Sequence, residues 1–110
     1  MPRPSCDSGS MTANNPEAPI AVAREELLAW VNVRRPGIYA TNAELADAFC
    51  QLLQPDTDLE LRSVWNPSAL MFEARWYQGG REVEDFPKPF CAEEAGDARL
   101  LACAELLRLP

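Results

Sequence analysis

Two consecutive glycines between two runs of aromatic and branched residues constrain this chain more than any other feature. Gly79 and Gly80 follow one such run at residues 70–77 and precede another at residues 82–86. A two-residue type I′ turn needs a positive φ at both central positions, and glycine adopts it without steric cost. The glycines therefore predict a β-hairpin around which the rest of the chain is organised.

The hairpin is expected to have one buried and one solvated face, because successive side chains of a strand point to opposite sides. The predicted cross-strand pairs are Gln78–Arg81, Tyr77–Glu82, Trp76–Val83 and Arg75–Glu84. The residues of the apolar face are Leu70, Phe72, Ala74, Trp76 and Val83. Those of the solvated face are Met71, Glu73, Arg75, Tyr77, Glu82 and Glu84. Helices with apolar stripes are expected to cover the first face.

Two helices are predicted before the sheet and one after it. Apolar residues recur at helical spacing over residues 19–35, and a second helix begins with the capping-box pair Thr41 and Glu44. Residues 59–65 alternate with period two and predict the first strand. Residues 92–109 predict a closing helix, and its wide apolar arc suggests contact with both the sheet and another helix. The predicted fold is α+β, with a three-stranded antiparallel sheet, helices packed on one face and the order α-α-β-β-β-α.

A single domain is expected over residues 19–110, and a disordered tail over residues 1–18. The tail is rich in proline, serine and asparagine and has no hydrophobic period. Met11 is an alternative to Met1 as the true start. A chain of 110 residues is long enough for one core but not for two.

The charge of the chain argues against several functions. There are 17 acidic and 10 basic residues, a net charge of −7, and no histidine. Such a surface repels phosphate backbones and anionic membranes, so neither direct nucleic-acid binding nor membrane binding is expected. Without histidine the commonest general base is missing, and we expect neither an enzyme nor a cofactor. The absence of a signal-like segment predicts a cytoplasmic protein.

The four cysteines are expected to be free thiols. They are Cys6, Cys50, Cys91 and Cys103, widely spaced and with no C-x-x-C pair among them. Free cysteine behaves as a small hydrophobe, so most of these thiols are expected to be buried. A disulfide or a four-thiolate metal site is the alternative, although no bound metal is expected.

Three tryptophans and one arginine lie at positions where packing is informative. Trp30 and Trp76 fall on apolar faces and are expected in the core, whereas Trp65, at a strand end, fits either the core or an exposed anchor. Arg99 lies among apolar positions of the closing helix. We expect its guanidinium to reach a carboxylate such as Asp85, and the alternative is a partner-facing arginine.

The sequence Phe-Glu-Ala-Arg-Trp-Tyr-Gln-Gly-Gly at residues 72–80, followed by an alanine-rich helix, resembles a double-stranded RNA-binding domain. The resemblance implies the α-β-β-β-α fold over residues 41–110, and some small phage α/β proteins look similar at this coarse level. That family binds RNA through a Gly-Pro loop after its first strand and a lysine-rich start to its last helix. The matching positions here are Asn-Pro-Ser at 66–68 and an acidic segment at 93–97, so RNA binding is not expected to carry over.

A second resemblance covers a smaller part of the chain. Residues 36–49 resemble the first two helices of a winged helix-turn-helix protein. A basic recognition helix would have to follow, but residues 54–58 read Gln-Pro-Asp-Thr-Asp. The resemblance therefore implies a DNA-binding layout without the element that reads DNA.

The function predicted best is that of a small acidic protein-binding module whose partner has a basic surface. An inhibitor from a phage or mobile element that blocks a nucleic-acid-binding surface, as anti-CRISPR proteins do, fits this description. The alternatives are a nucleic-acid-binding module of either resembled fold, and a structural or dimerising accessory subunit, including a homodimer. Aromatic and arginine anchors are expected to supply affinity while acidic residues steer association. The predicted contact residues are Trp65, Arg75, Tyr77, Glu82, Glu84, Glu93, Glu94 and Asp97.

Overall fold

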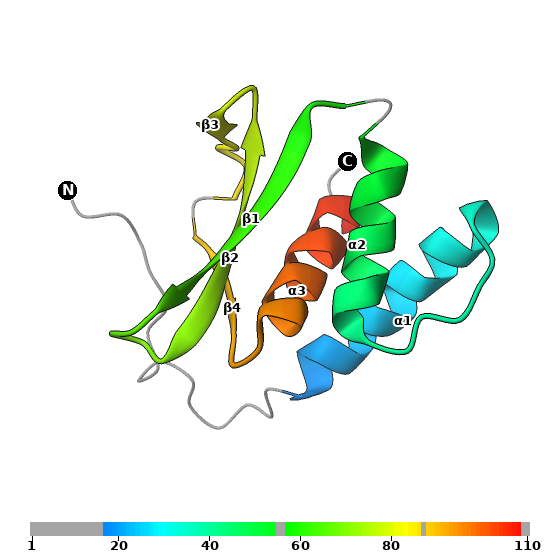
Figure 1. Cartoon of the computed structure of the whole chain (residues 1–110), viewed down its shortest axis with the longest axis horizontal. Coiled ribbons are helices and arrows are strands. Elements are labelled where there is room, and N and C mark those ends of the chain that lie inside the picture. The colour runs from blue at the N-terminus through cyan, green and yellow to red at the C-terminus, as the bar shows by residue number, and fades with distance from the viewer. Residues whose placement is uncertain (1–16, 55–56, 87, 109–110) are drawn as a thin grey trace.

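The computed structural model describes residues 17–54, 57–86 and 88–108, and it has the predicted α+β architecture (Figure 1). The helices are α1 (Glu17–Arg34), α2 (Asn42–Leu53) and α3 (Ala95–Arg108). The strands are β1 (Leu59–Asn66), β2 (Met71–Gln78), β3 (Arg81–Glu82) and β4 (Phe90–Ala92). Most of the predicted tail, residues 1–16, lies outside the described residues, and α1 begins two residues before the predicted helix start.

The central hairpin has the predicted turn. Gly79 and Gly80 have φ values of 61° and 82°, as a type I′ turn requires. The flanking residues of β2 and β3 pair in the predicted register, with Tyr77 opposite Glu82. Beyond β3 the backbone amide of Val83 still donates to the carbonyl of Trp76 at 3.0 Å, and the ladder then stops.

The third strand differs from the prediction because it is split. Both β3 and β4 pair with β2, β3 at one end and β4 at the other, and of the residues described between them, 84–86 and 88–89 lie outside the sheet. Pro89 has no amide hydrogen to donate to a ladder, which is consistent with this interruption. Because residues 90–92 form β4, α3 begins at Ala95 rather than at residue 92.

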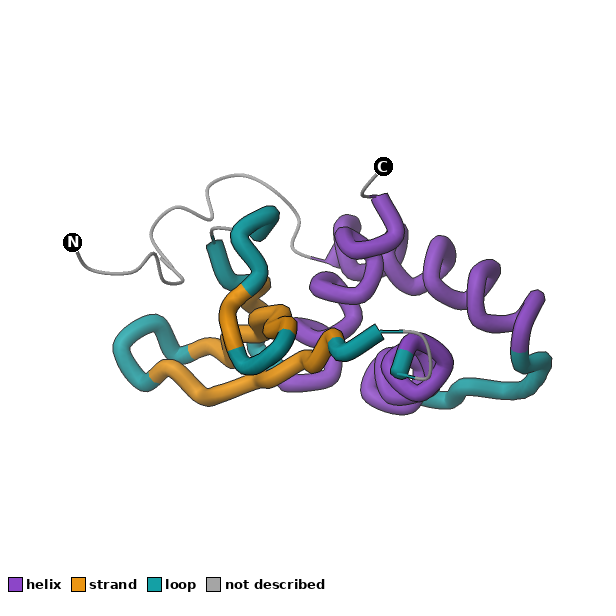
Figure 2. Tube along the Cα trace, turned by 90° about the horizontal axis from the view of Figure 1, so that it is seen from above, coloured by secondary structure: helices purple, strands orange, loops and turns teal. Residues whose placement is uncertain are grey.

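The helices form two layers on one face of the sheet (Figure 2). Helix α3 packs against β1, β2 and β4 and also against α1 and α2, so both sides of its wide apolar arc are covered. Helix α1 packs on α2 and α3 and makes no contact with the described strands. Its apolar stripe is therefore buried between helices rather than against the sheet.

Trp76 and Gly96 fix the position of α3. Trp76 is 1% exposed, and its indole Nε1–H donates to the carbonyl oxygen of Ala102 at 2.8 Å. At the start of the same helix, a Cβ on Gly96 would lie 3.0 Å from the backbone nitrogen of Ala43. The start of α3 can approach the start of α2 this closely only because residue 96 has no side chain.

Several single-residue predictions have clear outcomes. Thr41 caps α2, and its hydroxyl accepts a hydrogen bond from the amide of Glu44 at 3.1 Å, as predicted. Trp30 is only half-buried, with its ring 4.8 Å from that of Phe49. Arg99 does meet a carboxylate, but the partner is Asp47 on α2 rather than Asp85.

The cysteines are not all free thiols. Cys50 is half-buried and Cys103 is fully buried, and both are free, whereas Cys91 is disulfide-bonded. Cys6 lies outside the described residues. In the part of the chain that the structure describes, no helix combines the length and apolar character needed to cross a bilayer.

Candidate protein-binding surface

The sheet face opposite α3 carries the residues predicted to be solvated, but two of them are largely buried. The side chains of Glu73 and Arg75 are only 9% and 12% exposed. The expectation that both face water is therefore wrong, and Arg75 is not displayed as an anchor for a partner. The burial of these charges depends on tertiary packing, which alternation along one strand does not report.

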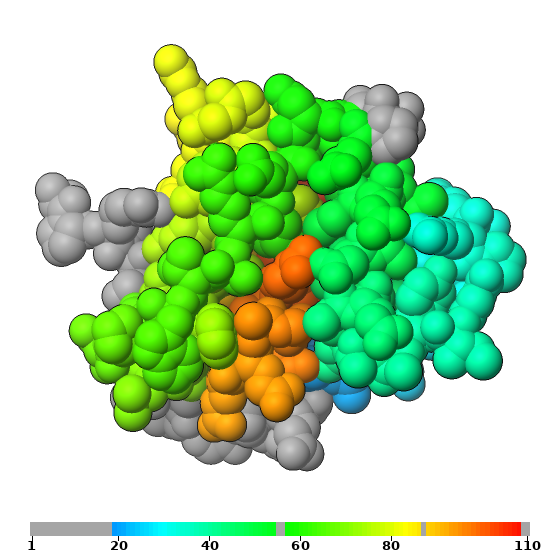
Figure 3. Space-filling view, in the orientation of Figure 1, coloured from blue at the N-terminus to red at the C-terminus, as the bar shows by residue number. Residues whose placement is uncertain are grey.

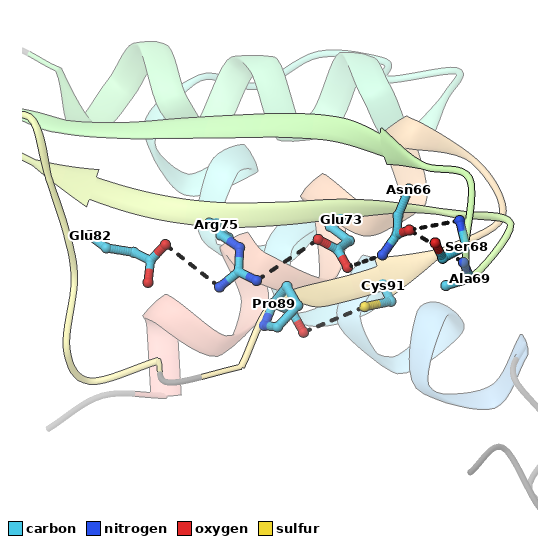
Figure 4. Close-up of polar contacts among 8 residues, drawn as sticks. All are labelled: Asn66, Ser68, Ala69, Glu73, Arg75, Glu82, Pro89 and Cys91. Atoms are coloured by element: carbon cyan, nitrogen blue, oxygen red, sulfur yellow. Dashed lines mark hydrogen bonds and ion pairs between the residues drawn. The ribbon is translucent and has the colours of Figure 1, made fainter. Parts of the chain in front are cut away.

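A chain of polar contacts runs along this face (Figure 4). Arg75 lies 3.6 Å from the carboxylate of Glu82 and 3.8 Å from that of Glu73. Glu73 accepts a hydrogen bond from Asn66 Nδ2 at 2.7 Å. The Asn66 Oδ1 atom accepts from the amides of Ser68 at 2.9 Å and of the next residue at 3.3 Å. The predicted pair Arg75–Glu84 does not form, because β3 ends at Glu82.

These contacts hold the β1–β2 turn in place, and the end of β1 and the turn that follows it display large apolar side chains to solvent. Val64 is 60% exposed, Trp65 47% and Leu70 69%, and we call these three residues the apolar tip. The Trp65 ring packs edge-on against Phe72, with centroids 5.0 Å apart, so its orientation is fixed while about half of it remains exposed.

Leu70 has an unusual backbone for its residue type. Its φ of 56° lies in the left-handed region, and it is the one non-glycine residue with positive φ among those described. A bulky residue in this region costs about 1–2 kcal/mol relative to glycine or asparagine. The expectation that Leu70 lies in the strand on the buried face is wrong, since β2 begins one residue later and the side chain points into solvent.

The predicted acidic residues Glu93 and Glu94 lie at the same end of the sheet as the apolar tip. Trp65 pairs with Phe72 across β1 and β2, and Phe72 pairs with Ala92 across β2 and β4. The exposed Glu93 and Glu94 follow directly on Ala92. Figure 3 shows the β1–β2 turn and the start of α3 side by side along the lower edge of the molecule.

The remaining predicted contact residues lie elsewhere. Tyr77 and Glu82 are paired at the opposite end of the sheet, where Arg62 lies over the Tyr77 ring at 4.5 Å. Glu84 is exposed beyond the end of β3. Asp97 accepts a hydrogen bond from Asn42 Nδ2 at 2.6 Å, and it therefore joins the starts of α2 and α3.

The predicted contact residues therefore do not form one continuous surface. They lie at two opposite ends of the sheet, and the residue between these ends, Arg75, is largely buried. Trp65, Glu93 and Glu94 come together at the tip, and the apolar residues beside them, Val64 and Leu70, were not predicted as contacts. The exposure of Leu70 could have been suspected from the proline-containing turn after β1. A leucine at the end of such a turn can be left outside the following strand.

The described residues contain no group of three or more cysteine, aspartate or glutamate side chains arranged to hold a metal ion. In comparisons with known proteins, no family model matches the chain, and neither a curated protein nor a solved structure matches it.

Proposed function

We propose that this protein is a protein-binding module that inserts its apolar tip into an apolar pocket bordered by basic residues of the partner. The observation that carries the proposal is Leu70, a large apolar side chain that is 69% exposed on a left-handed backbone. Solvent exposure and backbone strain both disfavour leucine at this position as far as stability is concerned. Strained positions cluster at binding sites, where the strained residue is retained for a contact made outside the folded chain.

The chemistry around the tip favours a basic protein surface as the partner. Glu93 and Glu94 lie beside the tip, and the whole chain carries a net charge of −7. Acidic residues at the rim of an apolar contact attract a basic partner and raise the rate of association. The same residues repel a nucleic-acid backbone, which argues against the alternative of direct RNA or DNA binding. Blocking the basic nucleic-acid-binding surface of another protein is one function of this kind.

The tip is also suited to binding because it is rigid. Asn66 fixes the turn through its own side chain, and the Trp65 ring is held against Phe72. Preorganised side chains lose little conformational entropy on binding, so more of their contact energy appears as affinity. Tryptophan is among the residues that most often dominate such interfaces.

Replacing Leu70 with asparagine should separate stability from binding. Asparagine tolerates the left-handed backbone, so we expect the free energy of unfolding to rise by about 1 kcal/mol. Binding to the partner should weaken at least about tenfold, because an apolar anchor is lost. Urea denaturation and surface plasmon resonance measure the two effects. A stabilised variant with unchanged affinity would mean that Leu70 makes no contact with the partner.

A pair of charge-matched variants tests which end of the sheet is used. Immobilised wild type captures candidate partners from the native host, and association kinetics are then compared for E93K/E94K at the tip and E84K/D85K, which changes exposed residues elsewhere. Each variant changes the net charge by the same amount. We expect association to slow severalfold for E93K/E94K and to change little for E84K/D85K.

Two outcomes would overturn the proposal. If E84K/D85K slows association and E93K/E94K does not, the partner binds away from the tip. If the wild type binds duplex RNA or DNA at micromolar concentration with a steep salt dependence, the protein is a nucleic-acid-binding module instead.

A further inference from the structure

Helices α2 and α3 bring two thiols and an ion pair together where they pack. Helix α2 contributes Asp47 and Cys50, and α3 contributes Arg99 and Cys103. The spacings of three and four residues place each pair on one face of its helix. Across the interface, Arg99 Nη2 lies 2.6 Å from Asp47 Oδ1, and the two thiols are near enough for each to shift the pKa of the other.

The side chains of this cluster become less exposed to solvent from the ion pair toward Cys103. The side chains of Asp47 and Arg99 are 50% and 25% exposed, Cys50 is half-buried, and Cys103 is 0% exposed. Cys50 is therefore partly accessible to a small solute, whereas Cys103 is enclosed in the core. The cluster combines a partly exposed thiol with a neighbouring buried one.

The surroundings make the two thiols chemically unequal. A hydrogen bond with Cys103 lowers the pKa of Cys50 against the effect of burial, and the positive charge of Arg99 lowers it further. Burial raises the pKa of Cys103 well above its ordinary value, and its hydrogen bond with Cys50 adds to this. The charge of Asp47 raises both values. The thiolate is the nucleophilic form of cysteine, so Cys50 is the more reactive of the two.

Arg99 interacts with both Asp47 and Cys50. Its Nη2 atom is held by Asp47, and a hydrogen bond from its guanidinium lowers the pKa of the Cys50 thiol. A guanidinium beside a thiol stabilises the thiolate form.

We propose that Cys50 and Cys103 are a hydroperoxide-oxidised thiol pair, with Cys50 reacting first and Cys103 closing a disulfide that joins α2 to α3. The geometry supports this order, since the partly exposed Cys50 on α2 faces the fully buried Cys103 on α3, where the two helices pack. A disulfide between them requires the two sulfur atoms to reach a bond length of about 2.05 Å.

The reaction balances with one hydroperoxide per protein. The Cys50 thiolate attacks the terminal oxygen of the hydroperoxide, an S–O bond forms, and the O–O bond breaks. The departing alkoxide, or hydroxide in the case of hydrogen peroxide, takes up the proton released from Cys50. Cys103 then attacks the Cys50 sulfur, the S–O bond breaks, and the hydroxide leaves with the Cys103 proton as water. Two thiols are oxidised to a disulfide, and the hydroperoxide is reduced to an alcohol or water.

Peptide mapping of the full chain after oxidation tests the pairing. Purified protein is treated with hydrogen peroxide, alkylated and digested with trypsin, which does not cut before Pro36 or Pro89. Cys50 then lies on fragment 35–62, Cys103 on fragment 100–108 and Cys91 on fragment 82–99. We expect fragments 35–62 and 100–108 to become linked with the loss of two hydrogen atoms.

Matched variants separate a reactive pair from two thiols that merely fill the core. In Cys103→Ser, Cys50 should accumulate as a sulfenic acid that dimedone traps, whereas in Cys50→Ser the buried Cys103 should stay reduced. Arg99→Met should slow the oxidation of Cys50 severalfold, because the cation that stabilises its thiolate is lost. The proposal is overturned if the two fragments stay unlinked in excess peroxide, or if they link no faster in the native protein than in urea.

Discussion

Replacing Trp76 with alanine is expected to lower the free energy of unfolding by about 4 kcal/mol, the typical cost of removing a buried tryptophan from a core. Trp76 is 1% exposed and lies on the sheet face that α3 covers. It also donates a hydrogen bond to Ala102, so its loss removes both packing and a polar link between sheet and helix. The free energy of unfolding of a small domain is only about 5–15 kcal/mol, so this single change removes a large fraction of it.

Trp76→Phe is the control that divides this effect into its parts. Phenylalanine keeps most of the apolar contact but cannot donate to the carbonyl of Ala102. We expect a loss of about 2 kcal/mol, from the missing hydrogen bond and the reduced volume. Urea denaturation with unchanged m-values measures both variants. A loss as large as that of the alanine variant would show that the hydrogen bond, rather than packing, holds α3 on the sheet.

Features set by neighbouring residues could be predicted from the sequence. Gly79 and Gly80 predicted both the turn and its register, because positive φ at two consecutive positions is rare for any other residue. Thr41 and Glu44 predicted the start of α2, since the cap is made by groups three residues apart. The wide apolar arc of α3 predicted its two-sided packing for the same local reason.

Features that depend on distant partners could not be predicted. Residues 90–92 become a strand because the edge of β2 is free to pair with them beyond β3, and the helical pattern of the sequence gives no sign of this. The partner of Arg99 is Asp47, more than fifty positions away in the chain. Glu73 is likewise only 7% exposed, although the alternation of its strand places it on the sheet face opposite α3.

The candidate surface was predicted in its chemistry but not in its layout. Trp65, Glu93 and Glu94 were expected to contact a partner, and the strand register places all three at one end of the sheet. Leu70 was missed because its alternation with Phe72 suggests a strand residue. The side chain of Asn66 instead closes the turn over the residues before Leu70 and leaves that residue outside the ladder.

Replacing Arg75 with methionine is expected to lower the free energy of unfolding by about 3 kcal/mol, because it removes the cation from beside a buried carboxylate. Methionine keeps much of the aliphatic stem of Arg75 but not its charge. The Glu73 carboxylate, 9% exposed, would then keep its hydrogen bond from Asn66 and lose its ion pair with Arg75. The β1–β2 turn should loosen as a result, since Asn66 joins this carboxylate to the turn amides.

The double variant Glu73→Gln/Arg75→Met shows whether the buried charge is the cause. Glutamine keeps an acceptor for Asn66 Nδ2 while removing the negative charge. We therefore expect the double variant to be only about 1 kcal/mol less stable than wild type, which corresponds to a coupling of at least about 2 kcal/mol between the two positions. Urea denaturation of the wild type, both single variants and the double variant completes the cycle. Additive losses would mean that Glu73 and Arg75 contribute to the fold independently, and the chain of contacts along the open face would not be what holds the apolar tip in place.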